Sequence, residues 1–105
     1  MKDFDTARSD FMTYITEAKE AERVERFSNL DPTLYSAKAG QKNVKIIVQD
    51  HNGTDQSVFC FIRKADGAVL KAAGWKAPAK GARGTIYTDN PKEYGVSTYG
   101  ANYIR

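Results

Sequence analysis

The sequence predicts an α+β fold, in which one long N-terminal helix packs on a small antiparallel sheet, a meander, of about four strands. Two observations carry this prediction. Apolar residues recur at three- and four-residue steps in the first part of the chain, and after Pro32 they alternate in steps of two. Turn signals, Asn52-Gly53 and Asp66-Gly67, separate the alternating stretches. A chain of 105 residues fits one domain, over 1–105, with one small core.

The first element is an amphipathic helix over residues 3–28. Phe4, Phe11 and Ile15 lie on its apolar face, and neither Gly nor Pro interrupts the pattern. The helix must end before Pro32, because the residue before a proline is disfavoured in the helical conformation. We expect this helix to pack on the sheet, although a role in binding a partner or in oligomerisation stays open.

The residues after Pro32 are predicted to form strands, because apolar and β-branched residues alternate there. The candidate strands are 34–37, 44–49, 57–62, 68–71 and 85–88. The strand 57–62 has two apolar faces, Val58, Cys60 and Ile62 on one and Phe59 and Phe61 on the other, so it is expected to be central and covered on both sides. The predicted core residues are Phe11, Ile15, Ile46, Val48, Phe59, Phe61 and Val69.

Basic charge is concentrated between residues 63 and 84. The whole chain carries 16 Lys and Arg against 13 Asp and Glu, but in this stretch six cations accompany a single carboxylate, Asp66. Such a positive field favours an anionic ligand, for example a nucleotide, a phosphate or a nucleic acid. A solvated basic surface without a ligand is the alternative, and charge alone does not decide between the two.

Residues 74–85 combine cations, glycines and a tryptophan in one short stretch. The spacing of Lys76, Lys80 and Arg83 would place them on one side of a helical turn, and the glycines would let backbone N–H groups approach a phosphate. Arg83 could bind two phosphate oxygens at once and is expected to be the strongest contact. An aromatic ring would stack on a base, and a hydroxyl would donate a hydrogen bond. The predicted ligand-binding residues are Trp75, Lys76, Lys80, Arg83, Thr85 and Tyr87.

Standard phosphate-binding motifs are absent from the sequence. It contains neither the Walker A pattern nor the dinucleotide-binding glycine pattern. Gly81-Ala82-Arg83-Gly84 has the form of the Gly-x-x-Gly loop of KH domains, but that loop joins two helices and a strand is expected after Gly84. An exposed loop whose lysines only keep the protein soluble is the alternative for this segment.

Groups that could catalyse a reaction are scarce. The single histidine, His51, lies in an expected hairpin turn, and the single cysteine, Cys60, lies in the middle of an expected strand. We therefore expect no catalytic residue, no metal site and no cofactor. The sequence favours a protein that binds a ligand without turning it over, and not an enzyme.

The second half of the chain carries a distinctive pattern. It reads Val58-Phe59-Cys60-Phe61-Ile62, Asp66-Gly67, Leu70-Lys71-Ala72-Ala73, Trp75-Lys76-Ala77-Pro78-Ala79-Lys80-Gly81-Ala82-Arg83-Gly84-Thr85-Ile86-Tyr87 and Tyr99-Gly100-Ala101-Asn102-Tyr103-Ile104-Arg105. With this pattern, residues 57–105 resemble a group of short bacteriophage proteins of mostly unknown function. Small phage proteins with a basic, nucleotide-sized pocket include the sponges that sequester cyclic oligonucleotide signals of bacterial immunity, as anti-CBASS proteins do. The sequence is compatible with that class, which implies an immune-evasion protein that binds a cyclic oligonucleotide such as a cyclic dinucleotide.

Two other functions stay open. A small phage protein that binds nucleic acid would use the same cations on phosphates and stack Trp75, Tyr87, Tyr94 and Tyr99 on bases. A phage structural or host-interaction protein would need no nucleotide ligand. A compact basic segment suits a small ligand, whereas a nucleic-acid-binding protein usually spreads its cations further.

Location and assembly follow from composition and length. No apolar run is long enough to span a membrane, and we expect no signal peptide, because no apolar stretch follows the first residues. A single cysteine excludes a disulfide framework, so we expect a protein of the host cytoplasm without a membrane partner. A core of this size is marginal, which predicts a homodimer or tetramer.

Overall fold

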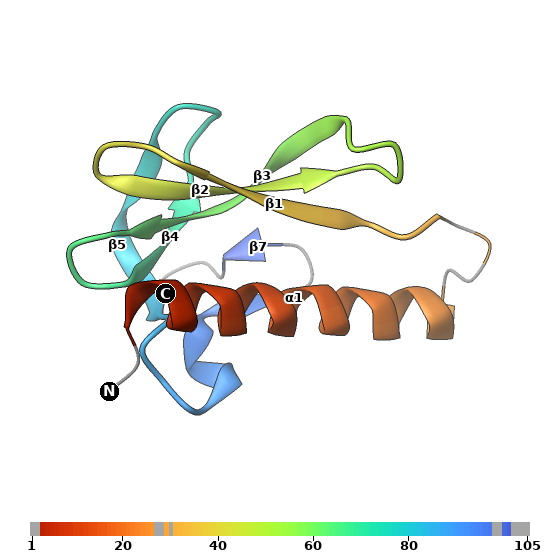
Figure 1. Cartoon of the computed structure of the whole chain (residues 1–105), viewed down its shortest axis with the longest axis horizontal. Coiled ribbons are helices and arrows are strands. Elements are labelled where there is room, and N and C mark those ends of the chain that lie inside the picture. The colour runs from red at the N-terminus through yellow and green to blue at the C-terminus, as the bar shows by residue number, and fades with distance from the viewer. Residues whose placement is uncertain (1–2, 27–28, 30, 98–99, 102–105) are drawn as a thin grey trace.

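The computed structural model describes residues 3–26, 29, 31–97 and 100–101. It confirms the α+β prediction, with one long helix and one antiparallel sheet (Figure 1). The sheet has five strands, in the order β1-β2-β3-β4-β5. The elements are α1 (Phe4–Arg26), β1 (Leu34–Ala39), β2 (Asn43–Gln49), β3 (Asp55–Arg63), β4 (Ala68–Ala72), β5 (Pro78–Thr85), the 3₁₀ helix η1 (Pro91–Tyr94), and the short pair β6 (Val96–Ser97) and β7 (Gly100–Ala101).

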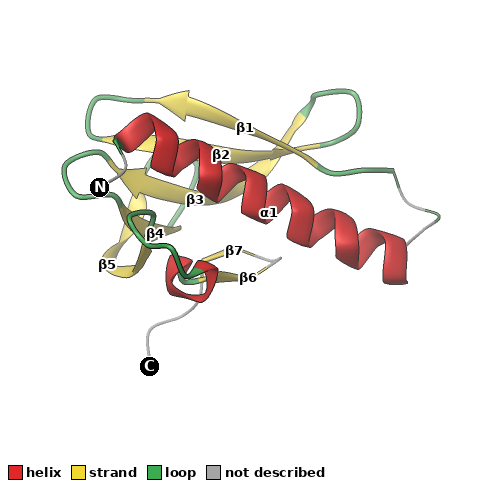
Figure 2. Ribbon diagram, turned by 60° about the horizontal axis from the view of Figure 1, so that its bottom comes forward, coloured by secondary structure: helices red, strands yellow, loops and turns green. Residues whose placement is uncertain are grey.

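Helix α1 lies along one face of the sheet (Figures 1 and 2). Asp3 caps its first turn, because the carboxylate accepts a hydrogen bond of 2.7 Å from the Thr6 backbone N–H. Ala7, Phe11 and Ile15, at four-residue spacing, are its buried residues. Two residues of the predicted helix, 27–28, lie outside the described residues. No helix in the described part of the chain is long and apolar enough to cross a membrane.

The main core lies between α1 and the sheet. Phe11 is fully buried and contacts the buried Tyr94 of η1 edge to face, with ring centroids 5.1 Å apart. The other buried members of this cluster are Ala7, Ile15, Val44, Ile46, Phe59, Cys60, Ile62, Val69 and Ile86. Of the predicted core, Val48 is only half-buried at its margin, and Phe61 belongs to a second, smaller cluster with Ala68 and Leu70. The core prediction is therefore confirmed for every residue except Val48.

The predicted division of β3 into two faces is wrong at two residues, Val58 and Phe59. Ile47 of β2 pairs with Val58, and the next residue, Ile46, pairs with Cys60, so Phe59 is an extra residue that forms a β-bulge. Beyond the bulge the alternation changes phase. Phe59 therefore joins Cys60 in the main core, while Val58 packs against the second cluster.

The predicted strand at 85–88 is also wrong. The chain pairs with β4 earlier, through β5, and leaves the sheet after Thr85. Ladder hydrogen bonds need only the backbone, so the glycine-rich segment can pair although its side chains have low strand propensity. Gly81, with φ +89°, and two register shifts accommodate its irregular course. Ile86 is apolar because it is fully buried in the main core, not because it belongs to a strand.

The β4–β5 hairpin is steeply inclined to the other strands. In Figure 1 the hairpin runs steeply across β1, β2 and β3, so the loop joining β4 to β5 lies on the side of the sheet away from α1. The two ends of this loop, next to β4 and β5, are close to each other, because the Ala73 N–H donates a hydrogen bond of 3.1 Å to the Ala77 carbonyl. The loop therefore borders the face of the sheet that α1 does not cover.

Candidate functional site

The predicted site residues lie on a loop and a strand, not on a helical turn. Trp75 and Lys76 belong to the β4–β5 loop, whereas Lys80 and Arg83 belong to β5. Gly84 does not have the left-handed conformation that would end a helical turn. Along an extended strand each residue advances the chain by about 3.3 Å, so the three cations are strung out and do not form one compact cluster.

Gly84 in this segment and Gly95 after η1 allow two chain segments to pack closely. A Cβ on Gly84 would lie 2.3 Å from the Tyr94 carbonyl oxygen, and one on Gly95 would lie 2.1 Å from the Arg83 carbonyl oxygen. The backbone of η1 therefore lies directly against the end of β5, which holds Tyr94 in the core. This close approach accounts for glycine at position 84 without a ligand.

Arg83 is less available to a ligand than expected. Its side chain is half-buried, and its Nε is buried without a hydrogen-bond partner among the described residues. A guanidinium that binds two phosphate oxygens through Nε and one terminal nitrogen needs Nε in the open. In this conformation Arg83 can offer a ligand only its terminal nitrogens.

Thr85 and Tyr87 lie beside the β3–β4 turn. The Thr85 hydroxyl oxygen accepts a hydrogen bond of 3.1 Å from the Tyr87 backbone N–H. The Tyr87 ring covers Gly67, where a Cβ would lie 2.5 Å from a ring carbon. Tyr87 is 36% exposed and keeps a ring surface that could be contacted. The nucleic-acid alternative loses one ring, because Tyr94 is buried, and Tyr99 lies outside the described residues.

Four lysines meet at one hollow on the uncovered side of the sheet. Lys38 at the end of β1, Lys42 in the β1–β2 turn, Lys45 on β2 and Lys76 in the β4–β5 loop line a cavity of about 390 Å³, together with the buried ring of Phe61. We call this the lysine hollow. None of the residues that line it is acidic. None of the four lysines is in an ion pair with a described residue, so no described carboxylate neutralises their positive charge.

Aromatic rings hold one of these lysines in place. The Lys45 ammonium lies 5.8 Å from the centroid of the Trp75 ring and 5.9 Å from that of Phe61. Cation–π attraction of this kind contributes about 0.5–1 kcal/mol at an exposed site. Trp75 remains 48% exposed, so it can still present ring surface to a ligand. The arrangement can bind an anion with a flat apolar group, with ammonium groups on the anion and the ring on the flat group.

Residues 4–101 match the family of unknown function DUF7717. The chain belongs to this family. The match includes α1 as well as the sheet, whereas the phage resemblance rests on residues 57–105. No curated protein and no solved structure matches the chain.

Sequence reasoning missed three of the four lysines that line the hollow of this DUF7717 protein. Lys38, Lys42 and Lys45 lie outside the basic stretch and are separated from Lys76 by 30 or more residues of chain. One signal was available for Lys45, since it lies between the apolar residues Val44 and Ile46 and so faces the opposite side of the sheet. The approach of the β4–β5 loop to the β1–β2 turn has no signal in the sequence.

His51, its neighbour Asp50 and Cys60 each have contacts or burial that do not depend on a catalytic role. His51 Nδ1 lies 3.2 Å from the Asp31 carboxylate, and both side chains are exposed. Asp50 accepts backbone hydrogen bonds from Thr54 and Asn52, and the Thr54 bond lowers the pKa of this carboxyl most. Cys60 is fully buried, and burial raises the pKa of its thiol. In the part of the chain that the structure describes, no three His, Cys, Asp or Glu side chains form a group that could hold a metal ion.

Proposed function

We propose that this protein binds a cyclic oligonucleotide, such as a cyclic dinucleotide, in the lysine hollow and sequesters it without turning it over. In this proposal it is a phage immune-evasion protein that acts in the host cytoplasm. The observation that supports it is the convergence of Lys38, Lys42, Lys45 and Lys76 on one hollow without an acidic neighbour. Unneutralised like charges repel one another, and a ligand with several phosphates relieves that repulsion.

The chemistry of the hollow suits both parts of such a ligand. Lysines act as separate point charges, so phosphates in different positions can each meet an ammonium group. Trp75 supplies a ring on which a base can stack, a contact worth about 1–3 kcal/mol. A volume of about 390 Å³ falls within the range of about 300–1,000 Å³ that is usual for ligand pockets.

The set of residues proposed to bind the ligand differs from the set predicted from the sequence. Trp75 and Lys76 keep the roles proposed for them from the sequence, and Lys42 and Lys45 join them. Lys80 and Arg83 on β5 do not line the hollow. They would contact only a ligand that extends beyond it, as would Thr85 and Tyr87.

A single-stranded nucleic acid is the second candidate ligand. Most of the residues lining the hollow are exposed, including Lys38, Lys42 and Lys76, so its rim does not enclose a ligand. An open basic surface with an exposed aromatic ring is also typical of proteins that bind single strands. Salt dependence separates the candidates, because a strand releases more counterions than a small ligand does.

The test is a titration followed by the fluorescence of Trp75, the single tryptophan of the chain. Cyclic dinucleotides, cyclic trinucleotides, mononucleotides and short single-stranded DNA are compared at two salt concentrations. A cyclic dinucleotide or trinucleotide should bind more tightly than a mononucleotide and be recovered unchanged after incubation. Tighter binding of DNA with a steep salt dependence would favour the second candidate.

Three variants that each lose one positive charge test where the ligand binds. Lys42→Gln and Lys45→Gln should each weaken binding, whereas Lys92→Gln on the exposed surface of η1 removes the same charge away from the hollow and should not. Equal effects of all three would mean that only net charge matters. Absence of binding by every nucleotide tested would reject the proposed function.

A further inference from the structure

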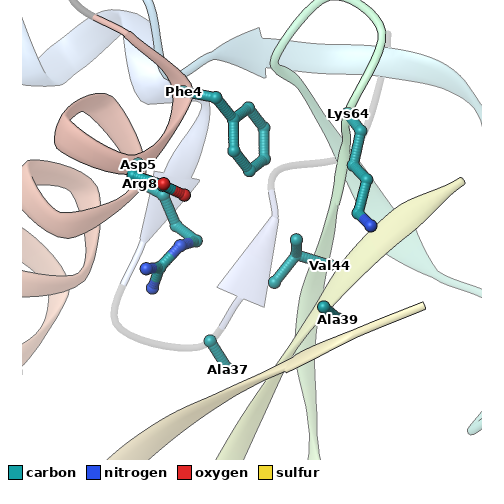
Figure 3. A pocket seen from close by; sticks show the side chains of 7 residues that line it. All are labelled: Phe4, Asp5, Arg8, Ala37, Ala39, Val44 and Lys64. Atoms are coloured by element: carbon teal, nitrogen blue, oxygen red, sulfur yellow. The ribbon is translucent and has the colours of Figure 1, made fainter. Parts of the chain in front are cut away.

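A second cavity lies on the other side of the sheet, between the start of α1 and strand β1 (Figure 3). It has a volume of about 540 Å³ and is lined by Phe4, Asp5, Arg8, Ala37, Ala39, Val44 and Lys64. None of these residues lines the lysine hollow except Ala39. The two cavities are therefore separate sites on opposite faces of β1.

The cavity exists because β1 presents small side chains to the helix. Tyr35, Ala37 and Ala39 pair with Val48, Ile46 and Val44, respectively, which pack in or against the main core. Tyr35 is large and packs edge to face on Phe59, with centroids 5.2 Å apart. The two alanines that follow leave the space between β1 and the first turns of α1 unfilled. Leucine at either position would occupy it.

Cations flank an apolar floor in this cavity. Figure 3 shows Phe4, Asp5 and Arg8 on the helix side and Lys64 on the opposite side. Val44 is buried and Phe4 is half-buried, so the space between the cations is apolar. The cavity carries two positive charges and one negative charge, which leaves one positive charge in excess.

Neither cation is paired with a carboxylate of the described residues. The Arg8 guanidinium donates to the Met12 sulfur at 3.3 Å, and thioether sulfur is a weak acceptor. Among the described residues, no carboxylate is within ion-pair distance of Arg8 or Lys64. Asp5 adds a negative charge that disfavours ligands with several phosphates. The chemistry thus differs from that of the lysine hollow.

We propose that this cavity is a second binding site, which takes an amphipathic monoanion: a single carboxylate or sulfonate attached to an apolar body. The anionic group lies against Arg8 on the helix side of the cavity, and the apolar body extends towards Lys64 over Phe4, Val44 and the two alanines. A charged hydrogen bond to Arg8 orients the ligand, while burial of its body supplies most of the affinity. This site does not depend on the proposed nucleotide-binding function.

Anilinonaphthalene sulfonate is a suitable probe, because it is such an amphipathic monoanion and fluoresces when bound. Decanoate should displace it. Arg8→Gln removes the cation, and Ala37→Leu fills the cavity; each should weaken binding of the probe about tenfold or more. Arg26→Gln, at the exposed far end of α1, and Lys45→Gln, in the lysine hollow, should change the dissociation constant by less than about twofold.

Three outcomes would overturn the proposal. The first is unchanged probe binding by Arg8→Gln, which decides the question even if Ala37→Leu does not fold. The second is loss of binding in Lys45→Gln alone, which would place the probe in the lysine hollow. The third is failure of decanoate to displace the probe. Cyclic dinucleotide binding by Arg8→Gln should stay unchanged, so failure here leaves the proposed function untouched.

Discussion

The contact between η1 and the end of β5 can be tested with four substitutions of glycine by alanine. The four positions separate two physical effects of an added Cβ, which are strain in the left-handed conformation and overpacking against neighbouring atoms. Gly95 has φ +73°, and its added Cβ would lie 2.1 Å from the Arg83 carbonyl oxygen. Gly84 lacks a positive φ, but its Cβ would lie 2.3 Å from the Tyr94 carbonyl oxygen. Gly53 has φ +81° with nothing within 4 Å, and Gly74 has neither feature.

The expected losses of stability follow from these two effects. The left-handed conformation costs a residue with a Cβ about 1–2 kcal/mol, and overpacking costs about 1–3 kcal/mol. Gly53→Ala should therefore lower the free energy of unfolding by about 1–2 kcal/mol, Gly84→Ala by about 1–3 kcal/mol, and Gly95→Ala by about 2–5 kcal/mol. Gly74→Ala should have no effect or stabilise the protein by about 0.4–1 kcal/mol.

Urea unfolding followed by circular dichroism measures these values, and thermal melting provides a second readout. For a domain of this size each kcal/mol corresponds to a shift of about 4–8 °C in Tm. Gly95→Ala should therefore melt about 10 °C or more below wild type. If Gly84→Ala is as stable as Gly74→Ala, η1 does not pack on β5 as described. The contact of Tyr94 with Phe11 would then also be wrong.

Three further predictions concern charge and burial. Lys45→Gln should weaken cyclic dinucleotide binding about tenfold, measured by Trp75 fluorescence, and should weaken it more than Arg83→Ala does. The hydrogen bonds from Arg63 lower the pKa of Asp66 from 3.8 to about 2. Because the folded state binds this proton more weakly than the unfolded state, the pair contributes stability above about pH 4 and loses it as the pH falls towards about 2. Acid unfolding of the Asp66→Asn variant, followed by circular dichroism, should therefore depend less on pH in that window, and an unchanged profile would contradict the assignment. Cys60 should react with iodoacetamide only when the protein unfolds, since its buried thiol has a raised pKa; rapid labelling of the native protein, detected by mass spectrometry, would contradict its burial.

The sequence alone was sufficient for α1, β2, β3 and β4 and for most of the core. Their signals are local. The period of the apolar residues changes from helical to strand spacing at Pro32, and turns such as Asp66-Gly67 mark where each strand ends. Burial of Phe11 and Ile15 follows from the same period, because a helix with one apolar face must cover that face.

Irregular pairing could not be read from local patterns. The bulge at Phe59 changes the phase of β3, and nothing in its run of apolar residues marks the extra residue. The chain from Pro78 to Thr85 forms a strand because β4 offers it an edge, although its own side chains favour a loop. At β5, hydrogen bonding to β4 overrides weak local propensity, and at Phe59 the register with β2 decides which face each side chain takes.

In the candidate site, too, some residues follow from local sequence and others only from the tertiary structure. Trp75 and Lys76 were found because cations and an aromatic residue adjacent in sequence are visible in any window of the chain. The partners of Lys76 were decided by the β4–β5 hairpin, which crosses the sheet steeply and brings its loop near Lys42 and Lys45. Which charges meet depends on strand order and on the angle of that hairpin. Both are set by packing between residues far apart in the chain, so only the tertiary structure could show where the positive charge gathers.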